Sequence, residues 1–228
     1  DEVVQESMGL TLEEERSLGR EVHRAVMSDL RVSRSRARRA RVERLIRPVL
    51  ARRARKGIRY TITVVENEAF NAFSTLGGHI YVHTGLMDAL QSDAALQFVL
   101  AHEVAHVDLK HCAANLTYFV RARQLGGDMM GAMAAMAHQV IKLGYSEARE
   151  YESDEWAYRT LRALGRSRSE ALEGPVVLAR IAGDPSGGRR SGKGRRDVES
   201  TVSREVRDHL RSHPNGVARL RRLRGLER

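Results

Sequence analysis

The sequence predicts a mainly helical α+β fold with a small β-sheet, and three observations carry this prediction. Apolar residues recur at helical spacing behind helix start signals, a region near residue 60 has β-branched residues at period two, and glycines mark turns and helix ends. The 228 residues suffice for one domain with a sizeable core. We expect one domain over residues 1–228, with a helical amino-terminal part (1–56), a core (57–182), a mobile basic loop (183–198) and a helical carboxy-terminal part (199–228).

The amino-terminal part begins with a predicted helix. Thr11 is its candidate N-cap, and Glu14 follows at the spacing of a capping box. A second helix or helix pair is expected over residues 31–56, ending at about Arg55. Its apolar residues are spaced as in an amphipathic helix, so we expect one buried face and one solvated basic face.

This basic segment accounts for the charge of the whole chain. Residues 31–56 hold twelve Lys or Arg and one acid, Glu43, a local charge of +11, while the chain as a whole carries +10 at a pI near 10.4. A solvated helix face is the simplest interpretation, and binding to an anionic membrane surface is the alternative. No specific nucleic acid is expected, because no aromatic residue lies between these arginines to stack on bases.

A small sheet is predicted after the basic segment. From Gly57 the pattern changes to period two, with Ile58, Tyr60, Ile62 and Val64 on one face of a strand. Two more short strands are expected at residues 69–74 and 79–83, with a Gly-Gly turn at residues 77–78 between them.

The rest of the chain is predicted to be helical. Ser92 or Asp93 caps a helix through residue 106, and further helices are expected at 115–142, at 145–164 with Gly165 as its stop, and at 168–182. Residues 183–196 are rich in Gly, Ser, Arg and Pro, which is typical of a loop. A helix at about 201–212 leads to His213, and Pro214 starts the final turn.

The most informative stretch is His102-Glu103-Val104-Ala105-His106. One helical turn brings both histidines to one face, where neutral ring nitrogens can bind one Zn²⁺. Glu103 lies beside the metal, where it can take a proton from the attacking water. The pattern therefore indicates a metallopeptidase.

The third metal ligand must come from elsewhere in the chain. The metzincin pattern needs Gly at position 109 and His at 112, where this chain has Leu109 and Cys112. On the predicted helix at 145–164, Glu150 and Asp154 lie one turn apart on a shared face. Glu150 would complete the zinc site, and Asp154 would accept the free N–H of His102. The alternative is a solvated acidic face paired with neighbouring arginines.

Several further motifs occur in a fixed order along the chain. They are Asn71-Ala72-Phe73-Ser74, Gly77-Gly78-His79-Ile80-Tyr81-Val82-His83-Thr84-Gly85-Leu86, the motif at 102–106, His111, residues 150–154 and His213-Pro214. In this order they resemble the M48 peptidase family, which includes the Ste24, HtpX, Oma1 and BepA-like proteases. The resemblance runs from about Met8 to Leu223, nearly the whole chain.

The resemblance implies a zincin fold of the gluzincin type, with a small sheet beside the metal helix and one Zn²⁺ per chain. It implies that His102, His106 and Glu150 are the zinc ligands, that Glu103 is the catalytic base, and that Asp154 holds a ligand from behind. His213 and Arg219 fall on the family's late His-Pro-x-x-x-x-Arg pattern. The histidine lies near the metal there, either as a transition-state donor or, in a latent form, as an extra ligand. His213 or Arg219 would stabilise the developing oxyanion.

The strand at 78–83 has two interpretations. As an exposed edge beside the metal helix it would pair with an extended peptide, which makes Gly78, His79, Ile80 and Tyr81 candidate substrate-binding residues; an interior strand is the alternative. Asn71 would orient the strand or the substrate. His111, five residues past His106, is expected to point away from the ligands and to be structural.

The family implies zinc-dependent hydrolysis of unfolded or misfolded proteins, in cell-envelope quality control. One alternative is a latent or chaperone-like envelope protein with a self-blocked zinc site, and another is a lipid- or nucleic-acid-binding protein. The chain opens at Asp1 with no apolar leader, so we expect a mature form of the soluble exported branch, periplasmic or envelope-associated, without a tetratricopeptide extension. Cys112, the single cysteine, is expected to pack as a small apolar side chain. The oligomeric state stays open.

Overall fold

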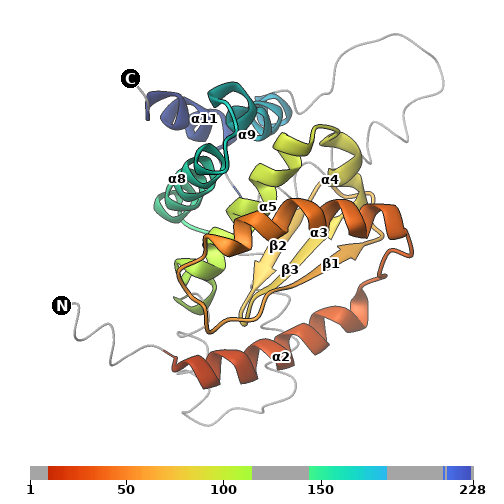
Figure 1. Ribbon diagram of the computed structural model, residues 1–228. Coiled ribbons are helices and arrows are strands. Elements are labelled where there is room, and N and C mark those ends of the chain that lie inside the picture. Colours follow the sequence, from red (N-terminus) through yellow and green to blue (C-terminus); the bar gives the residue numbers. More distant parts are fainter. Residues whose placement is uncertain (1–9, 115–143, 184–212, 214, 227–228) are drawn as a thin grey trace.

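The computed structural model describes residues 10–114, 144–183, 213 and 215–226. Helices surround a three-stranded sheet (Figure 1), which confirms the predicted fold class. The predicted helices at 115–142 and 201–212, the basic loop after residue 183 and the turn at Pro214 lie outside the described residues.

The first described helix, α2 (Leu12–Asp29), begins with the predicted capping box. The Thr11 hydroxyl accepts from the Glu14 N–H, and the Glu14 carboxylate accepts from the Thr11 N–H at 2.8 Å. In the helix, Gly19 crosses the turn at Gly77, and a Cβ on Gly19 would lie 2.7 Å from the Gly77 Cα. The two backbones therefore approach more closely than any other residue type at position 19 would allow.

The basic segment forms one helix, α3 (Arg36–Ala51), with Val42, Leu45, Ile46 and Val49 on its buried face, as predicted. The helix is shorter than predicted at both ends. Before it, the chain is extended, because Ser33 donates its N–H to the Val64 carbonyl at 2.8 Å.

The carboxyl end of α3 falls short of the predicted Arg55. Asp108, at the end of another helix, accepts the N–H groups of Ala54 and Arg55, each at 2.8 Å. These two bonds use donors that a continuing helix would need for its own carbonyls, so the chain leaves the helix after Ala51.

The sheet consists of β1 (Thr61–Val65), β2 (Ala72–Thr75) and β3 (His79–His83), in the order β1-β3-β2. β3 runs parallel to β1 and antiparallel to β2. β1 and β2 begin later than predicted because turns precede them: the Ile58 N–H bonds the Arg55 carbonyl, and the Ala69 N–H bonds the Asn67 side chain.

The prediction of an exposed edge at residues 78–83 is wrong. β3 is the central strand, and its backbone is paired on both sides. Ile80 and Tyr81 are fully buried and His79 is half-buried. Period-two apolar spacing reports which faces of a strand are covered but not which strands lie beside it, so the interior interpretation, which the sequence left open, is the correct one.

The sheet is covered on both faces, which explains the burial of β3. Val64, Ile80 and Val82 join the main hydrophobic core with α3 and α5. Val65, Phe73 and Tyr81 form a second cluster with Val22 and Val26 of α2. Alternate side chains of each strand thus supply two different cores.

The helix that carries the histidine motif, α5 (Asp93–Asp108), lies at the centre of the molecule. The Ser92 hydroxyl caps it by accepting the N–H groups of Ala94 and Ala95, and every residue from Ala94 to Asp108 is buried. A short helix, α4 (Thr84–Ala89), precedes it. α5 packs against α3, β2 and two later helices, so its side chains are fixed from several sides.

The later helices are α8 (Glu147–Ala163), α9 (Arg168–Gly183) and α11 (Gly216–Gly225). α8 and α9 match the predicted helices, and Gly165 between them has the left-handed φ of +87° expected of a helix stop. α11 packs on α8 and α9 (Figure 1). Among the described residues, no helix combines the length and the apolar character needed to cross a bilayer.

Candidate metal centre

The two histidines of α5 point their Nε2 atoms at one another. The His102 and His106 Nε2 atoms lie 2.9 Å apart, and both residues are buried, at 3% and 0% exposure. The helical spacing of four residues is what brings the rings to one face.

Glu150 of α8 meets both imidazoles. Its Oε2 lies 3.4 Å from His102 Nε2, and its Oε1 lies 3.3 Å from His106 Nε2. Glu150 has no exposed surface. Burial raises the pKa of this carboxyl, but the charges of His213, Arg219 and His102 outweigh burial and hold its pKa well below the usual range. The carboxylate is therefore ionised and available as a metal ligand.

Asp154, one turn further along α8, lies behind His102. Its Oδ1 is 2.9 Å from His102 Nδ1. Arg219 of α11 bonds the same carboxylate through Nε at 2.7 Å and Nη2 at 2.6 Å, and its Nη1 lies 2.6 Å from Glu150 Oε2. Burial raises the pKa of Asp154, but Arg219 outweighs this and lowers it. One guanidinium thus binds two buried carboxylates, and its single positive charge offsets one of their two negative charges.

His213 reaches the same cluster from the segment before α11. Its Nδ1 lies 3.0 Å from Glu150 Oε1 and 3.3 Å from His102 Nε2. Its Nε2 points the other way, 3.4 Å from Glu103 Oε1. The ligand atoms of His102, His106, Glu150 and His213 all lie within 4.8 Å of one another.

Glu103 lies next to this cluster with no exposed surface. Neither of its carboxylate oxygens accepts a hydrogen bond from the described residues. A buried carboxylate without donors is costly unless something else supplies them, and such groups concentrate where a site has a chemical role.

The far side of His106 contacts residues that the sequence did not single out. Its Nδ1 lies 3.3 Å from Ser153 Oγ, and its ring stacks on Tyr145 at 3.7 Å between centroids. The Tyr145 hydroxyl in turn lies 3.1 Å from the sulfur of Cys112, which is buried as expected. Ser153 lies within the motif at residues 150–154, but the sequence assigned no role to Ser153 or to Tyr145.

The prediction that His111 points away from the ligands is wrong. His111 Nδ1 lies 3.1 Å from His106 Nδ1. α5 ends at Asp108, and Lys110 has a left-handed φ of 63°, which turns the chain back so that His111 faces the last turn of the helix. The prediction assumed that the helix continues through residue 111, where five residues would place the ring on another face.

The donor set fits a tetrahedral metal ion. Two ligands at about 2.0–2.1 Å from one ion lie about 3.3 Å apart at a tetrahedral angle. Five of the separations between ligand atoms of His102, His106, Glu150 and His213 run from 2.9 to 3.4 Å, and all of these atoms lie within 4.8 Å of one another. When the His102 proton is on Nδ1 toward Asp154, its Nε2 presents a lone pair, so this atom, His106 Nε2 and the Glu150 carboxylate can together bind a cation.

The pKa values of the two histidines also indicate that a cation is favoured here. Burial lowers the pKa of His102, but Glu150 and Asp154 outweigh it and raise the pKa to about 9. Burial holds the pKa of His106, only 2.9 Å away, well below its usual value. The cluster therefore attracts one positive charge between these rings, and a bound metal would take that place.

The predicted substrate residues lie on the sheet rather than in the cluster. Gly78 has a left-handed φ of +89° in the turn before β3, and Asn71 is buried, with its carbonyl accepting from the His83 N–H at 3.0 Å. His79 stacks on His23 of α2 at 4.1 Å, so its ring faces α2. The Tyr81 hydroxyl lies 2.7 Å from His23 Nδ1 and likewise faces α2.

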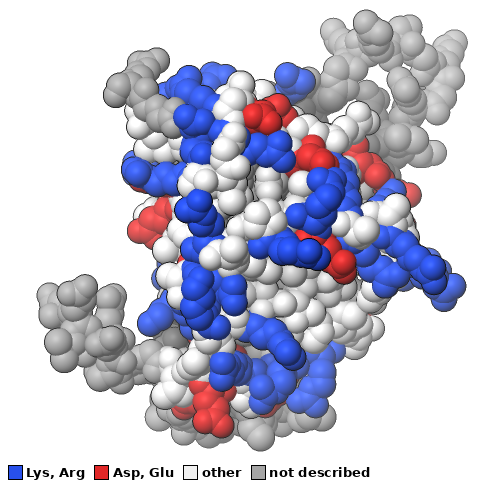
Figure 2. Space-filling view, viewed as in Figure 1, with Lys and Arg blue, Asp and Glu red and all other residues white. Residues whose placement is uncertain are grey.

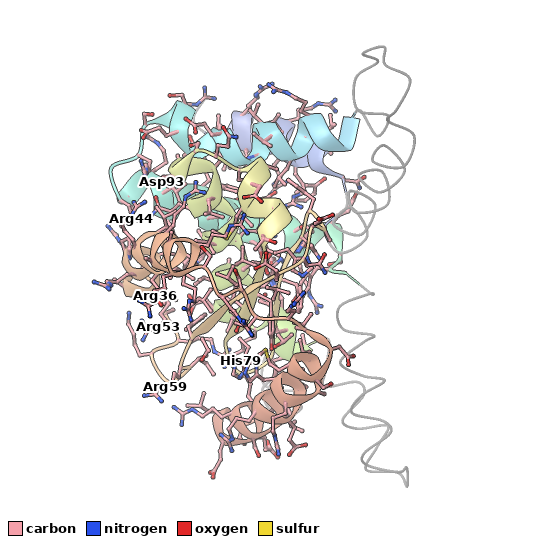
Figure 3. All side chains as sticks on the ribbon, turned by 90° about the vertical axis from the view of Figure 1, so that its right-hand side faces the viewer. Arg36, Arg44, Arg53, Arg59, His79 and Asp93 are labelled. Atoms are coloured by element: carbon pink, nitrogen blue, oxygen red, sulfur yellow. The ribbon has the colours of Figure 1, made fainter. Side chains whose placement is uncertain are left out.

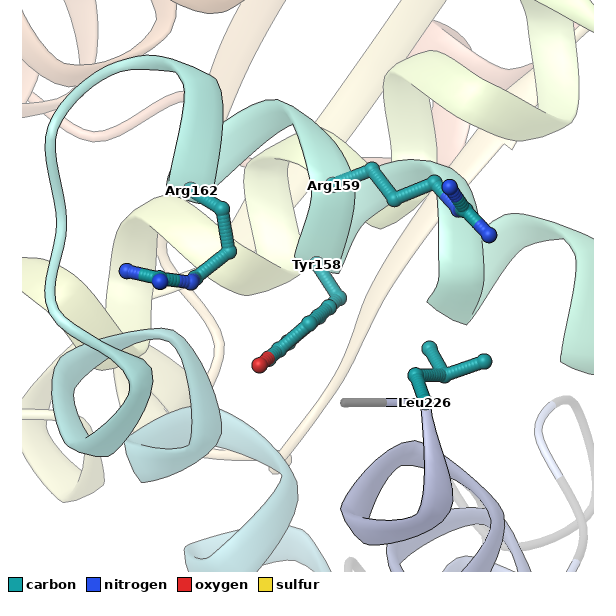
Figure 4. Close-up of a pocket in the computed structure, with 4 residues that line it drawn as sticks. All are labelled: Tyr158, Arg159, Arg162 and Leu226. Atoms are coloured by element: carbon teal, nitrogen blue, oxygen red, sulfur yellow. The ribbon is translucent and has the colours of Figure 1, made fainter. Parts of the chain in front are cut away.

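A separate pocket of about 270 Å³ lies where α8 meets the end of α11. It is lined by Tyr158, Arg159, Arg162 and Leu226 (Figure 4). None of these residues contributes to the metal cluster, so the pocket is distinct from the candidate site.

Comparison with known proteins agrees with the geometry. Residues 35–227 match the model of peptidase family M48. The chain is 27% identical over 179 residues to the mitochondrial metalloendopeptidase OMA1 of Arabidopsis thaliana, covering 74% of this chain and 32% of the relative. It is 29% identical over 140 residues to a putative beta-barrel assembly-enhancing protease of Vibrio cholerae, covering 54% and 28%. It is 31% identical over 122 residues to the metalloprotease LoiP of Escherichia coli, covering 49% and 48%. The chain thus spans half or less of the length of these relatives.

Proposed function

Because the chain belongs to peptidase family M48 and is a metallopeptidase, we propose that it is a zinc-dependent endopeptidase acting on unfolded or misfolded proteins. The observation that carries the proposal is the buried convergence of His102, His106 and Glu150 beside Glu103. Nitrogen and carboxylate donors at tetrahedral spacing are the set that zinc hydrolases use, with one position left for water. We also propose that the chain is a single peptidase domain, since one core cluster includes residues from Val42 to Leu223.

The chemistry follows from the residues around the donors. Zn²⁺ would supply Lewis acidity, which activates water and polarises the scissile carbonyl. Glu103 takes the proton from the attacking water and delivers it to the leaving amine, a role that suits a buried carboxylate without donors of its own. The Nε2 edge of His213, 3.4 Å from Glu103, is the candidate oxyanion donor, worth roughly 3 kcal/mol. Arg219 acts from behind, since its donors face Asp154 and Glu150.

The burial of the site supports unfolded polypeptides as substrates. Glu103, His106 and Glu150 have no exposed surface. A rigid folded domain cannot reach such a site, so we propose substrates that lack stable tertiary structure. A role in envelope protein quality control, and a periplasmic or envelope location, are proposals that the name of the Vibrio cholerae relative supports.

The test compares metal content with turnover of an unfolded substrate such as casein. The wild type should bind about one Zn²⁺ per chain and cleave casein, and chelator should abolish cleavage. Glu103→Gln should keep the metal and lose at least about 10³-fold in turnover, because the proton acceptor is gone. Glu147→Gln, which removes a charge at an exposed position of α8, controls for nonspecific effects on cleavage. Loss of zinc together with activity in Glu103→Gln would contradict the assigned role.

A second candidate is a latent form in which His213 fills the position of the water. The observation in its favour is that His213 Nδ1 lies 3.0–3.3 Å from Glu150 Oε1 and His102 Nε2, the spacing of a fourth ligand. Closed four-ligand zinc sites are structural rather than catalytic. His213→Ala separates the two: casein turnover rises if His213 blocks the site and falls if it stabilises the oxyanion, at unchanged metal content.

We also propose that the basic face of α3 binds an anionic membrane surface. Arg36, Arg39 and Arg47 are exposed and have no ion-pair partner among the residues described. Basic side chains gather on this face (Figure 2), and Arg36, Arg44, Arg53 and Arg59 project from one side of the molecule (Figure 3). Each basic residue near an anionic bilayer contributes about 1 kcal/mol.

Vesicle sedimentation tests this proposal. The wild type should bind vesicles that contain phosphatidylglycerol and not pure phosphatidylcholine vesicles. The combined variant Arg36→Gln, Arg39→Gln, Arg47→Gln should lose tenfold or more in affinity, whereas Arg20→Gln, Arg24→Gln, Arg221→Gln, with the same change of charge elsewhere, should lose little. Equal losses in the two variants, or preferential binding to single-stranded RNA over the vesicles, would contradict it.

A further inference from the structure

The two imidazoles of α5 are held from behind in different ways. His102 Nδ1 lies 2.9 Å from the Asp154 carboxylate, which accepts a hydrogen bond from it directly. His106 Nδ1 instead lies 3.1 Å from the Nδ1 of a second imidazole, His111. The other nitrogen of that ring, His111 Nε2, lies 3.0 Å from Glu152 Oε2. His106 is therefore also connected to a carboxylate, but through an intervening histidine.

The proton positions follow from the carboxylate end of this chain of contacts. An ionised carboxylate only accepts, so the His111 proton lies on Nε2, toward Glu152. His111 Nδ1 is then a lone pair, and His106 must donate to it from its own Nδ1. With its proton there, His106 has its lone pair on Nε2, the atom that faces His102 and Glu150.

One competing contact exists at the same nitrogen. The Ser153 hydroxyl lies 3.3 Å from both His106 Nδ1 and His111 Nδ1. A hydroxyl both donates and accepts, so it does not by itself fix which nitrogen of His106 carries the proton. Glu152 fixes the proton positions, because an ionised carboxylate cannot donate a hydrogen bond.

The backbone holds this arrangement in place. The left-handed φ of 63° at Lys110, uncommon for a residue with a Cβ, turns the chain after α5 so that His111 faces His106. α8 contributes three carboxylates at alternate positions. Glu150 contacts His106, Glu152 contacts His111 and Asp154 contacts His102. The Glu152 side chain is 62% exposed while that of His111 is 5% exposed.

We propose that Glu152 and His111 are positioning residues that fix the tautomer of His106 and so raise the affinity of the site for its metal. This inference rests on the proposed zinc site. Groups that hold a metal-binding histidine from behind typically contribute 10- to 100-fold to metal affinity.

The experiment measures the zinc dissociation constant by competition with a chromophoric chelator, together with the thermal midpoint of the metal-free protein. Glu152→Gln should raise the dissociation constant about tenfold and leave the metal-free midpoint unchanged, because an exposed amide replaces an exposed carboxylate. Glu147→Gln is the matched control, since it removes the same charge from an exposed position of the same helix. His111→Phe should weaken binding further, and His111→Gln, which keeps an acceptor for His106, should weaken it less.

The outcomes separate the two proposals. If the wild type binds no zinc, the proposed function fails. If the wild type binds zinc and Glu152→Gln matches Glu147→Gln, the positioning role is wrong while the zinc site stands. An equal or larger loss in Ser153→Ala than in Glu152→Gln would assign the role to the hydroxyl instead.

Discussion

Arg219 places one buried guanidinium between two buried carboxylates. It is 5% exposed, bonds Asp154 through two nitrogens and contacts Glu150 through the third. Ionised groups removed from water need charged partners at close range. The guanidinium thus holds α8 and α11 together at the point where the metal donors meet.

Replacing this guanidinium should destabilise the fold strongly. Arg219→Met should lower the free energy of unfolding by about 3–5 kcal/mol, because it leaves buried carboxylates uncompensated. Urea denaturation with Arg221→Met as the control tests this, since Arg221 is an exposed arginine of the same helix. Equal urea midpoints for the two variants would show that the ion pairs add nothing.

His79 gives a second prediction, for pH. Burial first, and then neighbouring His23, lower the pKa of His79 to about 4. The unfolded chain takes up a proton near pH 6.5 and the folded chain does not until about pH 4, so stability falls as pH drops through this window. Because the His79 ring is only partly buried, solvent screening keeps this loss of stability below the value that the full shift would give. In chelator, the loss of unfolding free energy between pH 7 and 4.5 should be smaller for His79→Gln than for the wild type. If the free energy of unfolding falls equally with pH in the two proteins, His79 does not contribute to the pH dependence.

At the residue scale, what could be predicted depended on local spacing. The pairing of His102 with His106 follows from one helical turn, and Glu150 follows as a carboxylate on a later helix. The contacts of Arg219 with Asp154 and of His111 with His106 could not be predicted in the same way. The first depends on how α11 packs on α8, and the second on an unusual backbone angle at Lys110 that no residue type signals.

At the scale of elements, the crossing of α2 over the turn between β2 and β3 leaves no room for a side chain at Gly19. Gly19 meets Gly77 at a distance where a Cβ would lie 2.6 Å from the Leu76 carbonyl oxygen. Backbone atoms cannot move aside as a flexible side chain can, so any larger residue at position 19 must push α2 away from the sheet.

Adding one methyl group here should therefore be costly. Gly19→Ala should lower the free energy of unfolding by about 1–3 kcal/mol through overpacking, although alanine favours helices. Gly225→Ala is the control, because a Cβ at Gly225 meets nothing within 4 Å. Thermal denaturation of both variants checks the difference; a Gly19→Ala midpoint at or above that of Gly225→Ala would contradict the close crossing.

The type of each helix or strand could be predicted better than the elements that lie beside it. Caps at Thr11 and Ser92 and the stop at Gly165 fixed helix ends because they act within a few residues. The early end of α3 depends on Asp108, more than fifty positions away, and the central place of β3 depends on a parallel pairing with β1. Such long-range partners leave no local pattern.

For the whole molecule, the metal site lies where segments far apart in the sequence meet. α5, α8 and the segment before α11 each supply donors, and Arg219 ties the last two together. An ion bound there crosslinks the native state alone, so binding stabilises the fold by mass action.

Metal removal should consequently lower the stability of the entire chain. At free zinc 100 times the dissociation constant, the native state gains about 2.7 kcal/mol. Calorimetry should show a lower melting temperature in chelator for the wild type and for Glu103→Gln, and a much smaller change for Glu150→Ala. If neither chelator nor added zinc changes the melting temperature of the wild type, the proposed crosslink is wrong.

The environment of Cys112 sets how the molecule behaves toward oxidants. The thiol is 2% exposed, and burial raises its pKa to about 12, so almost none of it is thiolate at neutral pH. Only the thiolate attacks disulfides or peroxides at a useful rate. The folded chain can therefore pass through an oxidising compartment without forming mixed disulfides or cysteine-linked dimers, and alkylating reagents should modify it only after it unfolds.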